Sequence, residues 1–191
     1  GAGYAGGFLQ GDVNYAKARF DFSLYQTVWD RPIIPIPDVE NYRQILSFKF
    51  NVEWIEPHTG QNFIPVYERF YAGGLGTIRG FERWGIGPRD GYDAVGGNFL
   101  ATASLEYSIP LYRAPMSPGS RMYLDVLRMV FFYDAAALAT DIKDFSTALI
   151  RTSVGFGFRL RIPALQGIPI SLDFGFPLSR QPEDETQRVA F

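Results

Sequence analysis

Residues 147–163 read TALIRTSVGFGFRLRIP, and apolar residues alternate with polar or glycine residues along this stretch. Successive side chains of a β-strand point to opposite faces, so the alternation predicts a strand with one apolar and one polar face. The pattern persists for far longer than the ~5–6 residues of a usual strand. Long strands with two contrasting faces are typical of sheets that cross a lipid bilayer.

The same period of two recurs along most of the chain. The other alternating segments are residues 13–28, 42–56, 97–111 and 169–179. In the second of them, Phe48 and Phe50 alternate with Lys49 and Asn51. A soluble antiparallel sandwich also alternates, but its strands are shorter and its polar face rarely carries charges of both signs in mid-strand. Strands of ~9–11 residues or more, apolar outward and polar inward, favour a transmembrane β-barrel.

Residues 122–138, MYLDVLRMVFFYDAAAL, depart from this rule because both faces of the segment are largely apolar. If Arg128 and Asp134 face the lumen, Val130 and Phe132 do so too, since all four have the same parity. An apolar patch on a polar inner wall needs a partner that covers it.

The connection between two of these strands, residues 57–96, is much longer than a hairpin loop of about 2–5 residues. It reads PHTGQNFIPVYERFYAGGLGTIRGFERWGIGPRDGYDAVG. Its large apolar residues are Phe70, Tyr71, Leu75, Ile78, Phe81, Trp84 and Ile86. That much apolar surface is costly to leave in water, so we expect the loop to fold into the barrel lumen and cover the apolar patch.

The strand count predicts a piece of a larger barrel. Seven strands are expected, the last of which, residues 187–191, is incomplete. Bacterial barrels have an even number of strands, eight or more, and an open edge cannot face lipid. We therefore expect residues 1–191 to be the C-terminal portion of an antiparallel transmembrane β-barrel, with residues 1–11 as an extracellular loop or the tail of an earlier strand.

Composition disfavours several function classes. Lys and Arg total 18 against 20 Asp and Glu, which gives no electrostatic case for nucleic acid. Cysteine is absent and His58 is the one histidine, so no thiolate or imidazole cluster for a metal and no Ser-His-Asp arrangement is expected. The opening GAGYAG matches G-x-G-x-x-G, but a strand follows it where the dinucleotide fold requires a helix. We expect no enzyme, cofactor or metal.

One group of residues points to a site. Ile78, Arg79, Gly80 and Phe81 lie within the long loop, while Glu106 and Asp134 fall on polar strand faces. A guanidinium offers planar bidentate donors to carboxylates, so Arg79 could clamp the loop to the wall. Arg79 could equally be a solvated loop charge, and the residues leave both interpretations open.

Four segments carry a family resemblance: AGGLGTIRGFERWGIGPRD, VGGNFLATASLEYSIPL, VFFYDAA and TSVGFGFRLRIP. In this order they resemble the C-terminal barrel of BamA-type outer-membrane protein assembly factors, the bacterial surface antigen-like superfamily. The resemblance implies a sixteen-stranded barrel whose sixth extracellular loop enters the lumen. It implies that Arg79 is the loop-motif arginine and that Asp134 and Glu106 are its wall partners. Ala136 stands where the family has glycine, and the chain stops at Phe191, short of the expected final strand.

The resemblance also implies a function: insertion and folding of β-barrel proteins into the outer membrane of a Gram-negative-type envelope, without enzymatic chemistry. The implied partners are unfolded outer-membrane protein clients, outer-membrane lipids and accessory assembly subunits. One alternative is a polypeptide-translocating transporter of the two-partner secretion type. Another is a passive porin-like channel, although the mixed charges on the predicted inner face provide no obvious ion filter.

Overall fold

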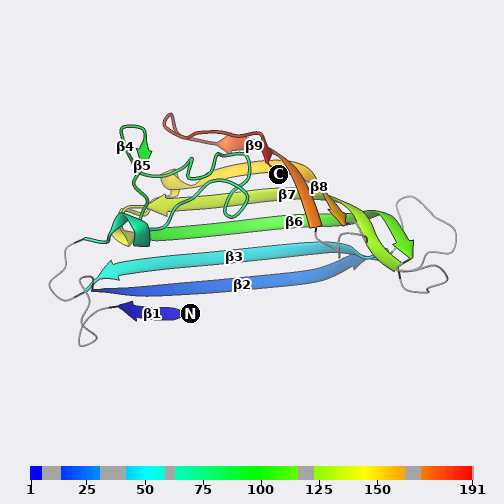
Figure 1. Cartoon of the computed structure of the whole chain (residues 1–191), viewed down its shortest axis with the longest axis horizontal. Helices are drawn as coiled ribbons and strands as arrows, with labels where there is room; N and C mark the ends of the chain where they lie inside the picture. Colours follow the sequence, from blue (N-terminus) through cyan, green and yellow to red (C-terminus); the bar gives the residue numbers. More distant parts are fainter. Residues whose placement is uncertain (6–13, 31–41, 59–62, 116–122, 162–168, 191) are drawn as a thin grey trace.

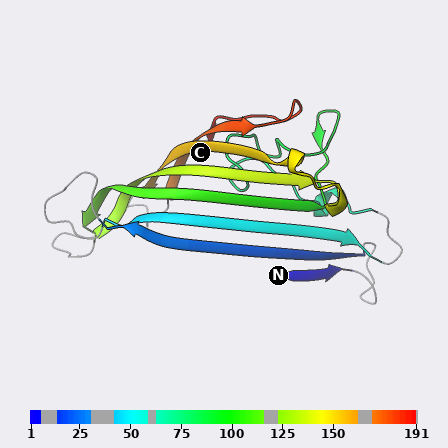
Figure 2. The ribbon, with the colours of Figure 1, turned by 180° about the vertical axis from the view of Figure 1, so that it is seen from behind.

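The protein is described here by a computed structural model that covers residues 1–5, 14–30, 42–58, 63–115, 123–161 and 169–190. Eight of its strands form one antiparallel sheet in the order β1-β2-β3-β6-β7-β8-β9-β10. The strands are β1 (Ala2–Ala5), β2 (Tyr15–Trp29), β3 (Gln44–Pro57), β6 (Phe99–Pro115), β7 (Tyr123–Ala139), β8 (Arg151–Arg161), β9 (Pro169–Ser179) and β10 (Val189–Ala190). Figures 1 and 2 show the long strands side by side in a curved sheet. A sandwich would divide these strands between two stacked sheets, so the single sheet argues against it.

The predicted strands agree with the structure except at two places. Of the two alternatives left open for residues 1–11, the structure shows an earlier strand at Ala2–Ala5 (β1), which adds an eighth strand to the sheet. Thr147–Leu149, predicted as strand, forms a 3-10 helix (η4) because local backbone bonds from Leu149 to Ser146 and from Ile150 to Thr147 replace the sheet ladder. Residues 31–41 and 162–168 lie outside the described residues.

The two faces of the sheet differ as the alternation predicts. Phe20, Phe131 and Val154 point outward and are 58%, 44% and 39% exposed. Asp134 and Ser153, which are cross-strand partners on the opposite face, are buried. An exposed apolar face is costly in water but suits lipid, so the outward face is the one that contacts the bilayer.

The long connection returns over the inward face of the sheet (Figure 1). It contains a short 3-10 helix, η2 (Val66–Glu68), and a two-stranded hairpin, β4 (Arg89–Asp90) with β5 (Asp93–Ala94). Another 3-10 helix, η3 (Ile142–Asp144), follows β7. No helix in the described part of the chain is long and apolar enough to span a membrane.

Candidate functional site

A hydrophobic cluster holds the long loop against the inward face of the sheet. The strands contribute Ile55, Leu100, Ala136 and Leu138, and the loop contributes Ile64, Phe70, Ala72, Ile78, Phe81 and Ile86. All of the strand residues have inward parity, so the inner wall is apolar near the loop end and ionic deeper down. Burying a large side chain such as Phe81 is worth about 1.5–3 kcal/mol. The cluster therefore gives the loop a fixed place on the wall.

The loop is less buried than expected at Leu75 and Trp84, and Ala136 of β7 lies in the hydrophobic cluster. Leu75 and Trp84 were expected to be buried, but they are 46% and 47% exposed. Trp84 has a positive φ of 62°, and its ring centroid lies 5.1 Å from that of Tyr71. Ala136, which replaces the family's glycine, sits in the hydrophobic cluster within β7. Its methyl group adds packing there.

Arg79 lies at the tip of this loop, against the carboxylates named from the sequence. Its Nε donates to Asp134 Oδ2 at 2.7 Å and its Nη2 to Asp134 Oδ1 at 2.9 Å. The Arg79 backbone N–H donates to Asp134 Oδ2 at 3.2 Å, and Nη1 donates to Glu106 Oε2 at 2.8 Å. The side chains of Arg79 and Asp134 are 9% and 3% exposed. The structure thus places Arg79 in a buried, bidentate ion pair, not in solvent.

Strand register brings the acceptors together. Ser104 lies opposite Asp134 across β6 and β7, and Glu106 lies opposite Phe132. The Ser104 hydroxyl donates to Asp134 Oδ1 at 2.7 Å, which orients the carboxylate toward the loop. Because residues two apart on a strand share a face, two neighbouring strands supply three polar side chains that accept hydrogen bonds from Arg79, those of Ser104, Glu106 and Asp134.

The Phe132 ring packs against the Arg79 guanidinium. Arg79 Cζ lies 3.5 Å from the ring centroid, a cation–π contact. Gly155 faces Phe132 across β7 and β8, and a Cβ there would lie 2.3 Å from Phe132 Cζ. The apolar patch predicted on this strand is therefore the platform under Arg79, and a glycine makes room for it.

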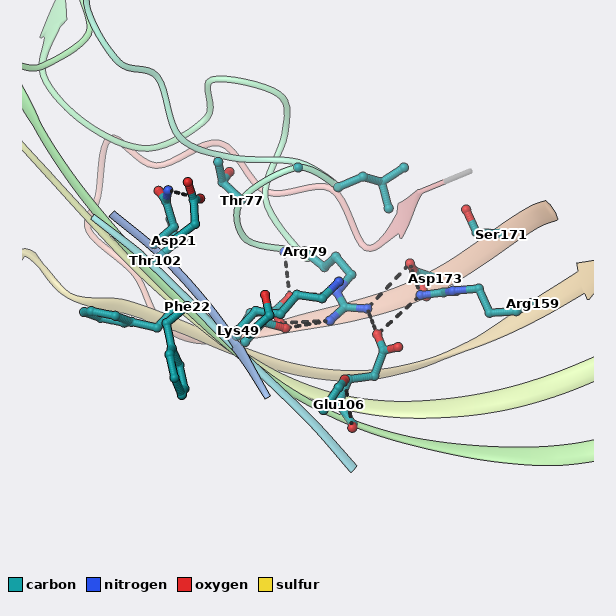
Figure 3. Close-up of a pocket in the computed structure, with 18 residues that line it drawn as sticks. Asp21, Phe22, Lys49, Thr77, Arg79, Thr102, Glu106, Arg159, Ser171 and Asp173 are labelled. Carbon is teal, nitrogen blue, oxygen red and sulfur yellow. Dashed lines mark hydrogen bonds and ion pairs between the residues drawn. The ribbon is translucent and has the colours of Figure 1, made fainter. Parts of the chain in front are cut away.

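Two further charged residues belong to the network, and the sequence did not single them out as partners. Arg159 Nη1 and Nη2 contact Asp173 Oδ1 and Oδ2 at 2.6 and 3.0 Å. Asp173 Oδ2 also lies 3.8 Å from Arg79 Nη1, and Arg159 Nη2 lies 3.6 Å from Glu106 Oε2. Figure 3 shows Arg79 from the loop pointing toward this group. The network thus spans β6, β7, β8 and β9.

Close backbone contact positions Gly80. Its φ is +92°, a conformation that favours glycine, and it packs against Gly175 of β9. A Cβ on Gly175 would lie 2.5 Å from the Gly80 nitrogen. The turn after Arg79 therefore fits only against a wall that has no side chain at this point.

The electrostatics keep Arg79 charged. Burial lowers the pKa of this loop residue, but the hydrogen bonds and charge of Asp134, with those of Glu106, outweigh that effect and raise the pKa above its ordinary value. On the open side, the network borders a cavity of about 420 Å³ lined by polar residues such as Lys49 and Asn51. One side of the Arg79 guanidinium therefore packs on the Phe132 ring, and the network opens on a polar cavity.

These features define a class of protein: part of a transmembrane β-barrel whose long loop is clamped to the inner wall by an arginine. The Omp85 superfamily domain matches residues 1–191. The chain therefore belongs to the Omp85 superfamily, and it forms part of an outer-membrane β-barrel. The resemblance seen in the motifs is confirmed.

Relatives with known names support the assignment. The chain is 31% identical to "Outer membrane protein assembly factor BamA" of Neorickettsia risticii, over 78% of the chain and 18% of the relative. It is 30% identical to "Sorting assembly machinery 50 kDa subunit" of Saccharomyces cerevisiae, over 66% of the chain and 26% of the relative. The crystal structure of BamA from Haemophilus ducreyi lacking POTRA domains 1–3 matches 93% of the chain and 34% of its own chain, with a TM-score of 0.67 and 26% identity. The chain spans less than a third of the curated relatives named here.

Proposed function

We propose that the protein to which this chain belongs inserts and folds β-barrel proteins into the outer membrane. BamA outer-membrane protein assembly factors and sorting and assembly machinery subunits lie among its relatives. The observation that carries the proposal is the buried Arg79–Asp134 pair, because it fixes a long loop inside a barrel of this superfamily. The proposed activity involves no covalent step and no cofactor.

The physical task explains why a braced barrel would be useful. An unfolded client strand has unpaired backbone groups, each of which costs several kcal/mol in lipid. A barrel that exposes a strand edge can pair with those groups, a form of β-augmentation. The Arg79 clamp and the hydrophobic cluster would hold the inner wall in shape while an edge opens. The clients, the surrounding lipids and accessory subunits are the partners we propose.

The clamp residues in this proposal are Arg79, Glu106 and Asp134. Ile78 and Phe81 anchor the motif on either side, being 0% and 1% exposed. Gly80 permits the turn between them. Because the loop occupies part of the lumen, the barrel is better suited to a braced assembly factor than to a wide passive channel.

The test uses the full-length protein with Arg79→Ala in cells depleted of the wild-type copy, and in lipid vesicles with an unfolded client barrel. We expect a folded barrel that assembles clients more slowly than wild type. Arg19→Ala is the matched control, since Arg19 also pairs with an aspartate but is 55% exposed. Full activity of Arg79→Ala in both assays would refute the brace. Wild-type protein that conducts steadily but leaves client folding unaccelerated would instead support the channel.

A further inference from the structure

A second buried guanidinium–carboxylate pair lies outside the Arg79 network. Arg151, the first residue of β8, contacts Asp184, which lies in the β9–β10 loop (residues 180–188). Arg151 Nε is 3.0 Å from Asp184 Oδ2 and Nη2 is 3.2 Å from Oδ1. The two side chains are 4% and 2% exposed. An isolated pair this deeply buried is costly unless its remaining polar atoms are satisfied.

The remaining polar atoms of the pair are satisfied by residues around it. Arg151 Nη1 donates to the Leu149 carbonyl at 2.6 Å, and Nη2 donates to Gln181 Oε1 at 2.7 Å. The Gln181 backbone N–H donates to Asp184 Oδ2 at 2.5 Å. Arg151 therefore connects the start of β8 to two points of the β9–β10 loop. These hydrogen bonds fix the shape of the β9–β10 loop.

The β9–β10 loop is in turn bonded to the Arg79 loop through the backbone. The Gln187 N–H donates to the Gly80 carbonyl at 3.1 Å, directly beside Arg79. The Glu82 N–H donates to the Glu185 carbonyl at 3.0 Å, and the Glu185 N–H donates to the Gly85 carbonyl at 2.9 Å. These bonds lie on both sides of Phe81 in the sequence. The two loops thus form a short ladder next to the clamp.

The same loop continues into the sheet edge. The Gly175 N–H of β9 donates to the Arg188 carbonyl at 2.8 Å, and Val189 of β10 pairs with Phe174. Gly175 is also the residue against which Gly80 packs. The Arg79 loop, the β9–β10 loop and β9 therefore meet at one point, Gly80.

We propose that Arg151 and Asp184 are positioning residues that couple the Arg79 clamp to the β9–β10 loop and through it to strand β10. The two loops open and close together, because the ladder between them cannot survive the displacement of either loop. The next step rests on the assembly function proposed above. During assembly, movement of an edge strand would change the contacts of Arg79. The coupling itself does not depend on that function.

The test is limited trypsin digestion of the full-length protein in lipid vesicles. Arg83 lies in the Arg79 loop and Arg180 and Arg188 lie in the β9–β10 loop, and all three are exposed. We expect Asp184→Asn to raise cleavage after all three arginines by about tenfold, which corresponds to ~1.4 kcal/mol. Glu183→Gln, a change of an exposed carboxylate one residue away, should change none of them. Faster cleavage after Arg180 and Arg188 without faster cleavage after Arg83 would overturn the coupling.

Hydrogen exchange on the wild-type protein tests the same coupling without a variant. The amides of Glu82, Glu185 and Gln187 should exchange with protection factors that agree within about threefold, because one opening exposes all three. They should lose protection together in Arg79→Ala. Amides that open at rates differing by more than about tenfold would refute the inference even if Asp184→Asn did not fold. Neither measurement uses client assembly, so coupled loops in an inactive protein would refute only the proposed function.

Discussion

Replacing Asp134 with asparagine removes the charge that Arg79 contacts most closely and preserves the size of the side chain. Asp134 is 2% exposed and receives three hydrogen bonds from Arg79, including one from its backbone. Breaking a buried ion pair costs about 3–5 kcal/mol. Arg79 would keep Glu106, which is 26% exposed, and would gain water from the adjoining cavity. We therefore expect loop closure to weaken by about 2 kcal/mol, or roughly thirtyfold in the population of the open loop.

The assay is trypsin cleavage after Arg83 in the full-length barrel. When the loop closes faster than the protease cuts, the cleavage rate reports the population of the open loop. The pair is isolated by a double-mutant cycle of Asp134→Asn, Arg79→Ala and the double variant. Asp21→Asn is the control, because Asp21 also pairs with an arginine but is exposed, and it should leave cleavage unchanged.

The sign and size of the coupling decide the outcome. For a buried bidentate pair, the double variant should open the loop no more than Arg79→Ala alone, which corresponds to a coupling of about 2 kcal/mol. A coupling below about 0.5 kcal/mol, typical of exposed pairs, would refute the clamp. The loop would then be held by the hydrophobic cluster, and Arg79 would contribute no more than a surface charge.

Three other changes have distinct expected outcomes. Gly175→Ala should displace the Arg79 loop and raise cleavage after Arg83, since its Cβ would lie 2.5 Å from the Gly80 nitrogen. Asp173→Asn should have a smaller effect on the loop than Asp134→Asn, because Asp173 lies 3.8 Å from Arg79 and is bonded mainly to Arg159; the same digestion measures it. Phe132→Leu should lower barrel stability by about 1 kcal/mol, through lost cation–π contact and packing, in guanidinium unfolding of the barrel.

The faces of the sheet and the burial of the loop were predictable because they depend on local pattern. Side-chain parity along a strand places Ser104, Glu106 and Asp134 on one face without knowledge of the fold. The many apolar residues of the loop predict a partner surface on the wall. Strand β7, which is apolar on both faces, contributes Phe132 to that surface, and its ring contacts Arg79. What could be read from the sequence was therefore which side chains face the lumen.

The contacts between those side chains were not predictable in the same way, since they depend on strand register. Arg159 reaches Asp173 diagonally because Gly157 lies directly opposite Asp173, where a Cβ would lie 1.9 Å from Oδ1. Parity places Arg151 on the inward face of its strand, but its partner Asp184 lies in a loop whose sequence has no periodic pattern. Register is set by the whole sheet, so a single strand's sequence does not contain it.

Glycines determine where the loop can approach the wall. Gly155, Gly157 and Gly175 lie on the inward face of β8 and β9, and each is too close to a neighbour to accept a side chain. They accommodate in turn the Phe132 ring, the Asp173 carboxylate and the Gly80 backbone. Charge alone would attract Arg79 to any of the wall carboxylates, but the shape of this glycine-lined strip admits its loop at one position. The clamp is therefore specified jointly by shape and charge, and moving the carboxylates to another strand pair would not transfer it.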